Sequence, residues 1–168
     1  MKLKTMTKDY FIKLADYNVW ANNLVCSWLE QVSESQWNQE VVSSFNSIQA
    51  TVLHLISAEY AWVQRMNKVE NVEWLATSFK GTKAEHIALW KDTSAKLKQF
   101  IIDFDENNLQ VNYTFKRING EVNTLPYYQT IAHAINHGSY HRGQLVTMLR
   151  QVGFTGVGST DLLNYFRL

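Results

Sequence analysis

The scarcity of helix-breaking residues constrains the fold of this chain more than any other feature of its sequence. One proline and seven glycines occur in 168 residues, so long stretches run without interruption. Within these stretches apolar residues recur at helical spacing, which predicts one buried face on each helix. Long helices are expected at about residues 7–31, 47–67, 82–103 and 124–152. Four such helices predict an all-α fold, a four-helix bundle, in a single domain over residues 1–168.

One short segment departs from the helical pattern. Between residues 110 and 123, apolar and polar residues alternate around Asn119-Gly120, which predicts a β-hairpin with a type I′ turn. We therefore expect a small β-hairpin before the last long helix, and not a sheet that organises the fold. Thr124 is expected to cap that helix, with Pro126 inside its first turn, where the missing N–H does no harm.

The expected helix ends carry capping signals. The segments Ser33–Gln36 and Thr82–Glu85 both have the capping-box form, with a hydroxyl residue followed three positions later by Gln or Glu. Ser47 is a plausible N-cap, and Gly153 is expected just beyond the end of the last long helix. The apolar residues of the tail, 154–168, indicate that it docks against the bundle.

Charge, cysteine content and hydropathy restrict the partners and the compartment. The formal net charge is +1 and no basic block occurs, so we expect no nucleic-acid partner. The only cysteine, Cys26, is expected to be a small buried hydrophobe, and it cannot form an internal disulfide. The N-terminus lacks the apolar core of a signal peptide, and no apolar run is long enough to span a membrane. We expect a cytoplasmic protein with no membrane partner.

Three of the five histidines, His133, His137 and His141, lie four residues apart on the last predicted long helix. A step of four turns an α-helix by about 400°, so neighbouring histidines lie about 40° apart around the axis and roughly 6 Å apart along it. Two neighbouring imidazoles can therefore reach one metal ion. Two ligands do not complete a site, and His54, at the edge of another apolar stripe, is the best candidate for a third. The alternative is that these are core and surface histidines with no shared ligand.

Several kinds of site are excluded by the absence of their motifs. H-E-x-x-H does not occur, so the chain is not a zincin, and the lack of E-x-x-H argues against a ferritin-like di-iron centre. No P-loop, G-x-S-x-G or G-x-G-x-x-G is present. Neutral imidazoles suit zinc, nickel, copper or iron. Three histidines with open positions are more typical of a catalytic site than of a closed structural one.

The motifs of the chain, taken together, resemble those of the DinB family. The resemblance covers nearly the whole chain and keeps the order of the motifs. They are Tyr17–Asn22, Ser44–Ile48, His54, Ala58–Trp62, Asn136–Gln144 and Asp161–Tyr165, of which Asn136–Gln144 is the most specific.

The resemblance implies a four-helix bundle with one divalent metal held by His54, His137 and His141. It also implies a homodimer, and it relates the chain to thiol transferases that use bacillithiol, mycothiol or glutathione. Tyr140 departs from the pattern, because many members have a histidine there. Since Tyr140 is beside a ligand position, we expect a changed pocket wall and an intact metal site. His133 lies about 80° around the helix from His141, so a place beside the ligands or at the surface is expected for it.

Other residues near these motifs have open roles. Gln144 lies on the stripe of His137 and His141, so it could orient a ligand or simply pack between helices. Arg142 is expected on a solvated face, with a carboxylate or an anionic substrate as alternative partners. Gly143 is expected to allow close approach of a neighbouring helix, and His86 to be solvated.

Two functions of different classes are compatible with the sequence. The first is a metal-dependent thiol (S-) transferase or hydrolase, in which a divalent transition metal, most plausibly zinc or nickel, activates a thiol or water. Its partners would be a small-molecule substrate and a low-molecular-weight thiol. The second is a non-catalytic, stress-related module that binds metal or a small ligand. No carboxylate lies in ligand spacing with the histidines, so the sequence identifies no general base.

Overall fold

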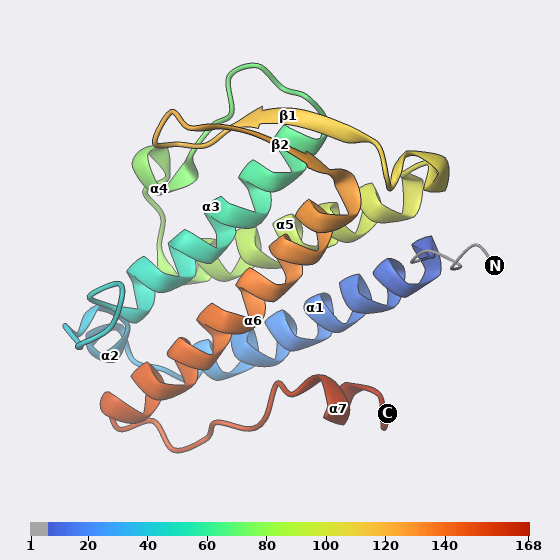
Figure 1. Ribbon diagram of the computed structural model, residues 1–168. Coiled ribbons are helices and arrows are strands. Elements are labelled where there is room, and N and C mark those ends of the chain that lie inside the picture. The colour runs from blue at the N-terminus through green and yellow to red at the C-terminus, as the bar shows by residue number, and fades with distance from the viewer. Residues whose placement is uncertain (1–6) are drawn as a thin grey trace.

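The computed structural model describes residues 7–168, and four long helices form its body (Figure 1). These helices are α1 (Lys8–Leu29), α3 (Ile48–Met66), α5 (Lys83–Asp103) and α6 (Tyr127–Gln151). Helix α1 packs against α5 and α6, and α3 packs against the same two helices from the other side. The predicted four-helix bundle is confirmed, and each predicted long helix lies within three residues of its expected bounds.

Short elements connect and cover the bundle. They are α2 (Glu34–Asn38), α4 (Leu75–Ser78), the 3-10 turn η1 (Glu106–Asn108), β1 (Asn112–Lys116), β2 (Val122–Pro126) and α7 (Leu162–Tyr165). Strands β1 and β2 pair in antiparallel register from Asn112 with Pro126 to Lys116 with Val122. Gly120, in the turn, has φ +87°, which explains why glycine stands there. The predicted hairpin is confirmed, and it lies across the ends of α3 and α6 (Figure 1). The predicted type I′ turn is wrong, because Asn119 lacks the positive φ that such a turn requires at both central residues, and only Gly120 is left-handed.

The predicted start of the last long helix is wrong by three residues. Thr124 does not cap α6, because it lies in β2 and its hydroxyl bonds that of Thr114 across the hairpin at 2.9 Å. Pro126 ends the strand and occupies the N-cap position, so α6 begins at Tyr127. The second strand therefore continues to Pro126, three residues beyond the end of the predicted hairpin at residue 123.

The capping predictions hold at α2, α3 and α5 and at the end of α6, whereas Thr7, at the start of α1, makes no side-chain capping bond. Both capping boxes form, with Gln36 Oε1 accepting from the backbone N–H of Ser33 and Glu85 Oε2 from that of Thr82. The Ser47 hydroxyl accepts from the backbone N–H of Ala50 at the start of α3. Gly153 follows α6 with φ +83°.

The core consists of two apolar halves separated by a polar layer. One half contains Trp37, Trp90 and Leu145, and the other contains Phe11, Leu97 and Ile131. Each long helix contributes to the layer between them, which we define as Asn18, Asn22, Glu59, Ser94 and Arg142; all five side chains are buried.

Hydrogen bonds connect the whole polar layer. Glu59 Oε1 accepts from the Asn18 and Asn22 amides at 2.7 and 2.9 Å, and Glu59 Oε2 accepts from Ser94 Oγ at 2.8 Å. Arg142 Nη1 donates to the amide oxygens of the same two asparagines at 2.7 and 2.8 Å. Each asparagine amide thus bridges Arg142 and Glu59: its oxygen accepts from the guanidinium and its N–H₂ group donates to the carboxylate. Burial raises the pKa of Glu59, and these hydrogen bonds and Arg142 oppose that rise.

The prediction of a solvated Arg142 is therefore wrong. The side chain is fully buried, and its guanidinium lies 5.2 Å above the Tyr17 ring. The sequence places Arg142 next to His141, a candidate ligand, but helical spacing could not show that the Arg142 side chain enters the polar layer.

Gly138, and not Gly143, is the glycine that permits close packing. A Cβ on Gly138 would lie 2.9 Å from Arg142 Nη1 and 3.0 Å from Asn18 Oδ1, whereas one on Gly143 would have no neighbour within 4 Å. The expected role of Gly143 in helix approach is thus incorrect.

Exchange of these two glycines for alanine should have opposite effects. Gly138→Ala should lower the free energy of unfolding by about 1–3 kcal/mol, because Arg142 is held from several sides and cannot move away. Gly143→Ala should raise it by about 1 kcal/mol, because alanine is the better helix former and meets no clash. Urea unfolding of both variants measures the difference. Equal effects would contradict the packing described here.

His86 is buried, contrary to the expectation of a solvated side chain. Its ring contacts Trp37 and Phe79 edge-on, at centroid distances of 5.5 and 4.9 Å. The Nδ1–H donates to the carbonyl of Thr82 at 2.8 Å. The capping segment Thr82–Glu85 and the connection after α4 fold over this position, so the first turn of α5 is covered.

The tail docks against the bundle, as its apolar content predicted. Leu162 and Tyr165 of α7 pack on the core half that contains Phe11, and the Tyr17 hydroxyl donates to the carbonyl of Thr160 at 2.9 Å. Figure 1 shows the tail returning along α1. Among residues 7–168, no helix combines the length and apolarity that crossing a bilayer requires.

Candidate metal centre

Three histidines from two helices meet on the side of the bundle where α3 faces α6. His54 comes from α3, and His137 and His141 lie one turn apart on α6. His137 Nε2 lies 3.2 Å from His54 Nε2 and 3.1 Å from His141 Nε2. All three candidate ligand atoms fall within 4.8 Å of one another. Three nitrogens at these separations can share one metal ion at ordinary ligand distances.

A hydrogen-bond chain orients His141. The Nδ1–H of its ring donates to Gln144 Oε1 at 2.7 Å, and the Gln144 amide donates to Ser44 Oγ at 2.9 Å. A proton on Nδ1 leaves a lone pair on Nε2, which is the nitrogen that faces His137. Gln144 therefore takes the orienting role, one of the two that its spacing allowed, and Ser44 is a partner that helical spacing did not indicate.

Aromatic rings hold His54 from two sides. Phe45, in the loop before α3, stacks on the His54 ring at a centroid distance of 4.3 Å and an interplanar angle of 29°. Trp74 meets the same ring edge-on at 5.7 Å. These contacts restrict rotation of the imidazole and keep Nε2 directed at the other two histidines.

The histidines are predisposed to stay neutral. Burial, followed by the charge of His141, lowers the pKa of His54 to about 4. Burial and the neighbouring histidines lower the pKa of His137 to about 3, and burial also lowers that of His141. At neutral pH the three imidazoles are therefore uncharged, and each has one nitrogen without a proton that is available as a ligand.

His133 lies outside this cluster, as the helical drift predicted. Its ring is exposed, packs against Trp62 at a centroid distance of 5.1 Å, and is 5.8 Å from the ring of His137. Burial of part of the ring and the charges of Arg117 and Arg65 lower its pKa. His133 thus borders the site on the side of the hairpin, where the two arginines approach it.

A pocket of about 650 Å³ opens directly beside the histidines. We call it the α3–α6 pocket; His54 and His137 form one end of it, and Trp62, Trp74 and the hairpin form its walls. Within residues 7–168, none of the side chains that line it is an Asp or Glu. Aromatic residues make up 13% of the sequence, and they contribute to the walls of this pocket as well as to the core.

Cys26 belongs to the core and not to the site. The residue is fully buried among apolar neighbours, and burial raises the pKa of its thiol to about 12. A thiol that stays protonated is a poor nucleophile and a poor metal ligand. The interpretation of Cys26 as a small hydrophobe is confirmed.

Comparisons with known proteins agree in the family and the fold. A sequence model of the DinB family matches residues 1–167. Protein DinB of Bacillus subtilis (strain 168) is 29% identical over 151 residues, which cover 87% of this chain and 88% of that protein.

Solved structures share the architecture. A DinB-like protein from Bacillus cereus ATCC 10987 has a TM-score of 0.71 at 16% identity, covering 91% of this chain and 97% of that one. YfiT from Bacillus subtilis, described as a probable metal-dependent hydrolase with an unusual four-helix bundle topology, has a TM-score of 0.71 at 11% identity, over 92% and 94% of the two chains. The family match over nearly every residue and the shared bundle together place this chain in the DinB family.

Proposed function

We propose that this chain is a metal-dependent enzyme in which His54, His137 and His141 bind one divalent transition metal, zinc or nickel. The observation that carries the proposal is the convergence of the three Nε2 atoms, with 3.1 and 3.2 Å between neighbours. Three neutral nitrogen ligands suit these metals and leave coordination positions for water or substrate. When bound, the metal would lower the pKa of a thiol or a water and so supply a nucleophile at neutral pH.

The residues around the histidines favour a thiol over water as the nucleophile. Water activation commonly uses a carboxylate as general base, and no Asp or Glu lines the described α3–α6 pocket. A thiol, with an ordinary pKa of about 8.5, needs far less help to lose its proton than water does. Transfer of a low-molecular-weight thiol to a small electrophile is therefore the first candidate reaction, and hydrolysis is the second. The description of YfiT as a probable metal-dependent hydrolase supports metal dependence in either case.

The missing carboxylate also supports a candidate of another class. A non-catalytic module that binds metal or a small ligand needs no general base, and its pocket would have the same lining. Measurable turnover would distinguish an enzyme from such a module.

Assembly of this chain as a homodimer stays a prediction.

A reconstitution experiment tests the proposed activity. The purified chain is assayed with cysteine, glutathione or bacillithiol and the electrophile monochlorobimane, in which the thiolate sulfur displaces chloride. We expect turnover with at least one thiol, its loss after removal of the metal by a chelator, and its recovery with zinc or nickel. Turnover that survives chelation would contradict the proposal. Saturable binding of thiols without product in any metal form would favour the module.

A further inference from the structure

The α3–α6 pocket extends from the histidines along α3 to a buried arginine. His54, Ala58, Trp62 and Arg65 all line it and follow one another on α3 at helical spacing. From His54 to Arg65 the helix rises by about 16 Å. The volume of the α3–α6 pocket, about 650 Å³, is in the range of pockets that bind a single small molecule.

The walls between the two ends are largely apolar. Trp62, Trp74 and Phe115 contribute aromatic rings, and Leu125 and Ile118 of the hairpin segment contribute aliphatic groups. Leu125 and Ile118 are exposed large hydrophobic side chains, at 37% and 58%. Such walls favour an apolar ligand body, whose binding would remove these groups from water.

Arg65 is a buried cation without a carboxylate partner among the described residues. It is 7% exposed, and the described chain contains no ion pair that includes it. Its Nε–H donates to the carbonyl of Lys116 at 3.1 Å, and its guanidinium lies 5.1 Å from the Trp62 ring centroid. A buried charge is costly unless it is paired, so the remaining N–H donors of Arg65 are suited to an anion.

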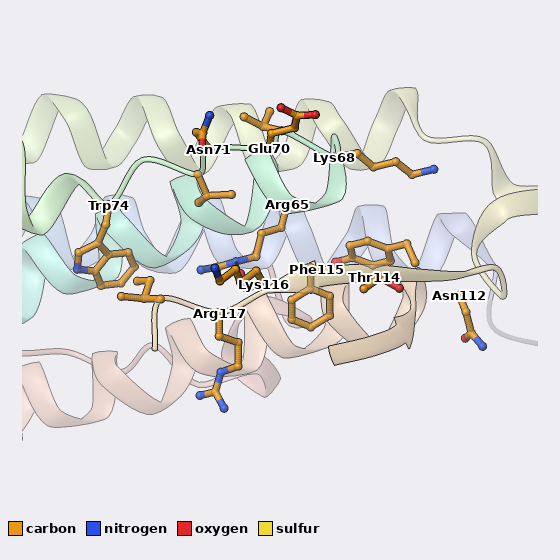
Figure 2. A pocket seen from close by; sticks show the side chains of 14 residues that line it. Arg65, Lys68, Glu70, Asn71, Trp74, Asn112, Thr114, Phe115, Lys116 and Arg117 are labelled. Carbon is orange, nitrogen blue, oxygen red and sulfur yellow. Dashed lines mark hydrogen bonds between the residues drawn. The ribbon is translucent and has the colours of Figure 1, made fainter. Parts of the chain in front are cut away.

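Arg117 brings a second cation to the same end of the pocket. Figure 2 shows Arg65 reaching from α3 to the hairpin, and Arg117 leaving the hairpin on the side of α6. Arg65 also borders the neighbouring pocket of about 800 Å³ drawn there. Burial lowers the pKa of Arg65 and the charge of Arg117 lowers it further, so the two cations repel each other. Among residues 7–168, the carboxylate that bonds Arg117 is that of Glu121, at 2.9 Å in an exposed ion pair.

An unused amide donor lies on the hairpin wall of the pocket, opposite Phe115 in the strand register. Asn123 Nδ2 is buried, lines the α3–α6 pocket and has no hydrogen-bond partner among the described residues. The free groups at the arginine end and on this wall are therefore N–H donors, and no acidic side chain lines the pocket to compete for them. An anion would satisfy the donors and reduce the repulsion between the arginines.

We propose that the α3–α6 pocket binds a small molecule with an apolar body and a terminal anionic group. The anionic group lies between Arg65 and Arg117, and the body lies along Trp62 and Trp74. The other end of the molecule then reaches His54 and His137. The identification of this molecule as the substrate rests on the proposed metal-dependent function, whereas its binding by the arginines does not.

A set of matched ligands tests the anionic end. The probes are 4-phenylbutanoate, its neutral analogue 4-phenylbutanamide, and phenethyl phosphate, each titrated into metal-free and metal-loaded protein while tryptophan fluorescence is recorded. At least one anion should bind about tenfold or more tightly than the amide in both forms, because hydrogen bonds to an ionised group are stronger than those to a neutral one. The tighter of the two anions identifies the group as a carboxylate or a phosphate.

Three arginine variants locate the effect. Arg117→Gln, on an exposed side chain that does not endanger the fold, should weaken anion binding about tenfold and leave amide binding unchanged. Arg65→Gln should act in the same direction. Arg150→Gln, an exposed arginine outside this pocket, is the matched control and should change neither.

Three outcomes would overturn the proposal. They are equal affinity for anion and amide, anion binding that is unaffected by Arg117→Gln, and no binding of any probe at millimolar concentration. Arg117→Gln decides the matter if Arg65→Gln does not fold. Failure of the metal site has a separate signature, since the metal content would be low while the metal-free protein still preferred the anion over the amide.

Discussion

The His137→Ala variant is expected to fold normally and to carry almost no metal. His137 is the central residue of the proposed metal site, because its Nε2 lies within 3.2 Å of the Nε2 atoms of both His54 and His141. Its removal leaves one imidazole on each of two helices, which is too few for tight binding of zinc or nickel. Metal per chain, measured by mass spectrometry after dialysis, should fall from about one to near zero. His54→Ala and His141→Ala should also lose most of the metal.

His133→Ala is the matched control for these variants. It removes an imidazole from the same helix, one turn away, whose ring is exposed and outside the cluster. It should therefore keep most of its metal. His86→Ala should keep its metal too, but this ring is buried against Trp37 and Phe79, so its loss would also destabilise the protein. Stoichiometric metal in folded His137→Ala would show that the ligand assignment is wrong.

Replacement of Arg142 should cause the largest loss of stability. Arg142→Met removes the cation that bonds the amide oxygens of Asn18 and Asn22 and leaves the buried Glu59 without compensation. Loss of one partner from a buried charged pair costs about 3–5 kcal/mol. Methionine keeps an apolar side chain of similar length, so the effect reports the lost charge and hydrogen bonds. Urea unfolding of the metal-free protein measures the change.

A double-mutant cycle separates the charge from the packing. Glu59→Gln removes the carboxylate but keeps its shape, so Arg142→Met combined with Glu59→Gln should be less destabilised than the sum of the single variants. The expected coupling is about 1–3 kcal/mol. Strict additivity would show that the two charges do not interact through the asparagines, and the polar layer would then be only a set of separate hydrogen bonds.

Local signals in the sequence were sufficient for most of the fold. The lack of proline and glycine and the helical period predicted the four long helices, because one apolar face per helix requires packing against others. The hairpin and the capping boxes at Ser33 and Thr82 were also predicted from short local patterns, whereas the type I′ turn was wrong because only Gly120, with φ +87°, is left-handed. The formation of hairpins and caps depends on a few neighbouring residues, so a short stretch of sequence is enough to predict it.

The errors concern side chains whose surroundings come from distant segments. Arg142 and His86 were expected in solvent, yet α1 and α3 bury the first and the connection near Phe79 covers the second. Gly143 was expected at a helix contact, whereas the close neighbours belong to Gly138. Helical periodicity gives the angle of each residue around its own helix, but not which neighbour it meets.

In the candidate site, too, the residues on one helix could be predicted and the contributions of distant segments could not. The spacing of His137 and His141 predicted that they converge, and the apolar stripe beside His54 indicated the facing helix. Phe45 and Ser44 come from a loop whose path no periodic pattern predicts. Arg65 could have been found, since it continues the stripe of His54, Ala58 and Trp62 on α3, whereas Arg117 depends on how the hairpin lies over the bundle.

X-ray absorption spectroscopy of the purified protein would identify both the bound element and its ligands. We expect one zinc or nickel per chain with three imidazole nitrogens, at about 2.0–2.1 Å for zinc, and at least one further oxygen, nitrogen or sulfur atom from water or another ligand. The multiple scattering that is typical of imidazole should be lost in His137→Ala. A metal surrounded mainly by oxygen or sulfur, or an imidazole signal that is unchanged in His137→Ala, would contradict the assignment of His54, His137 and His141.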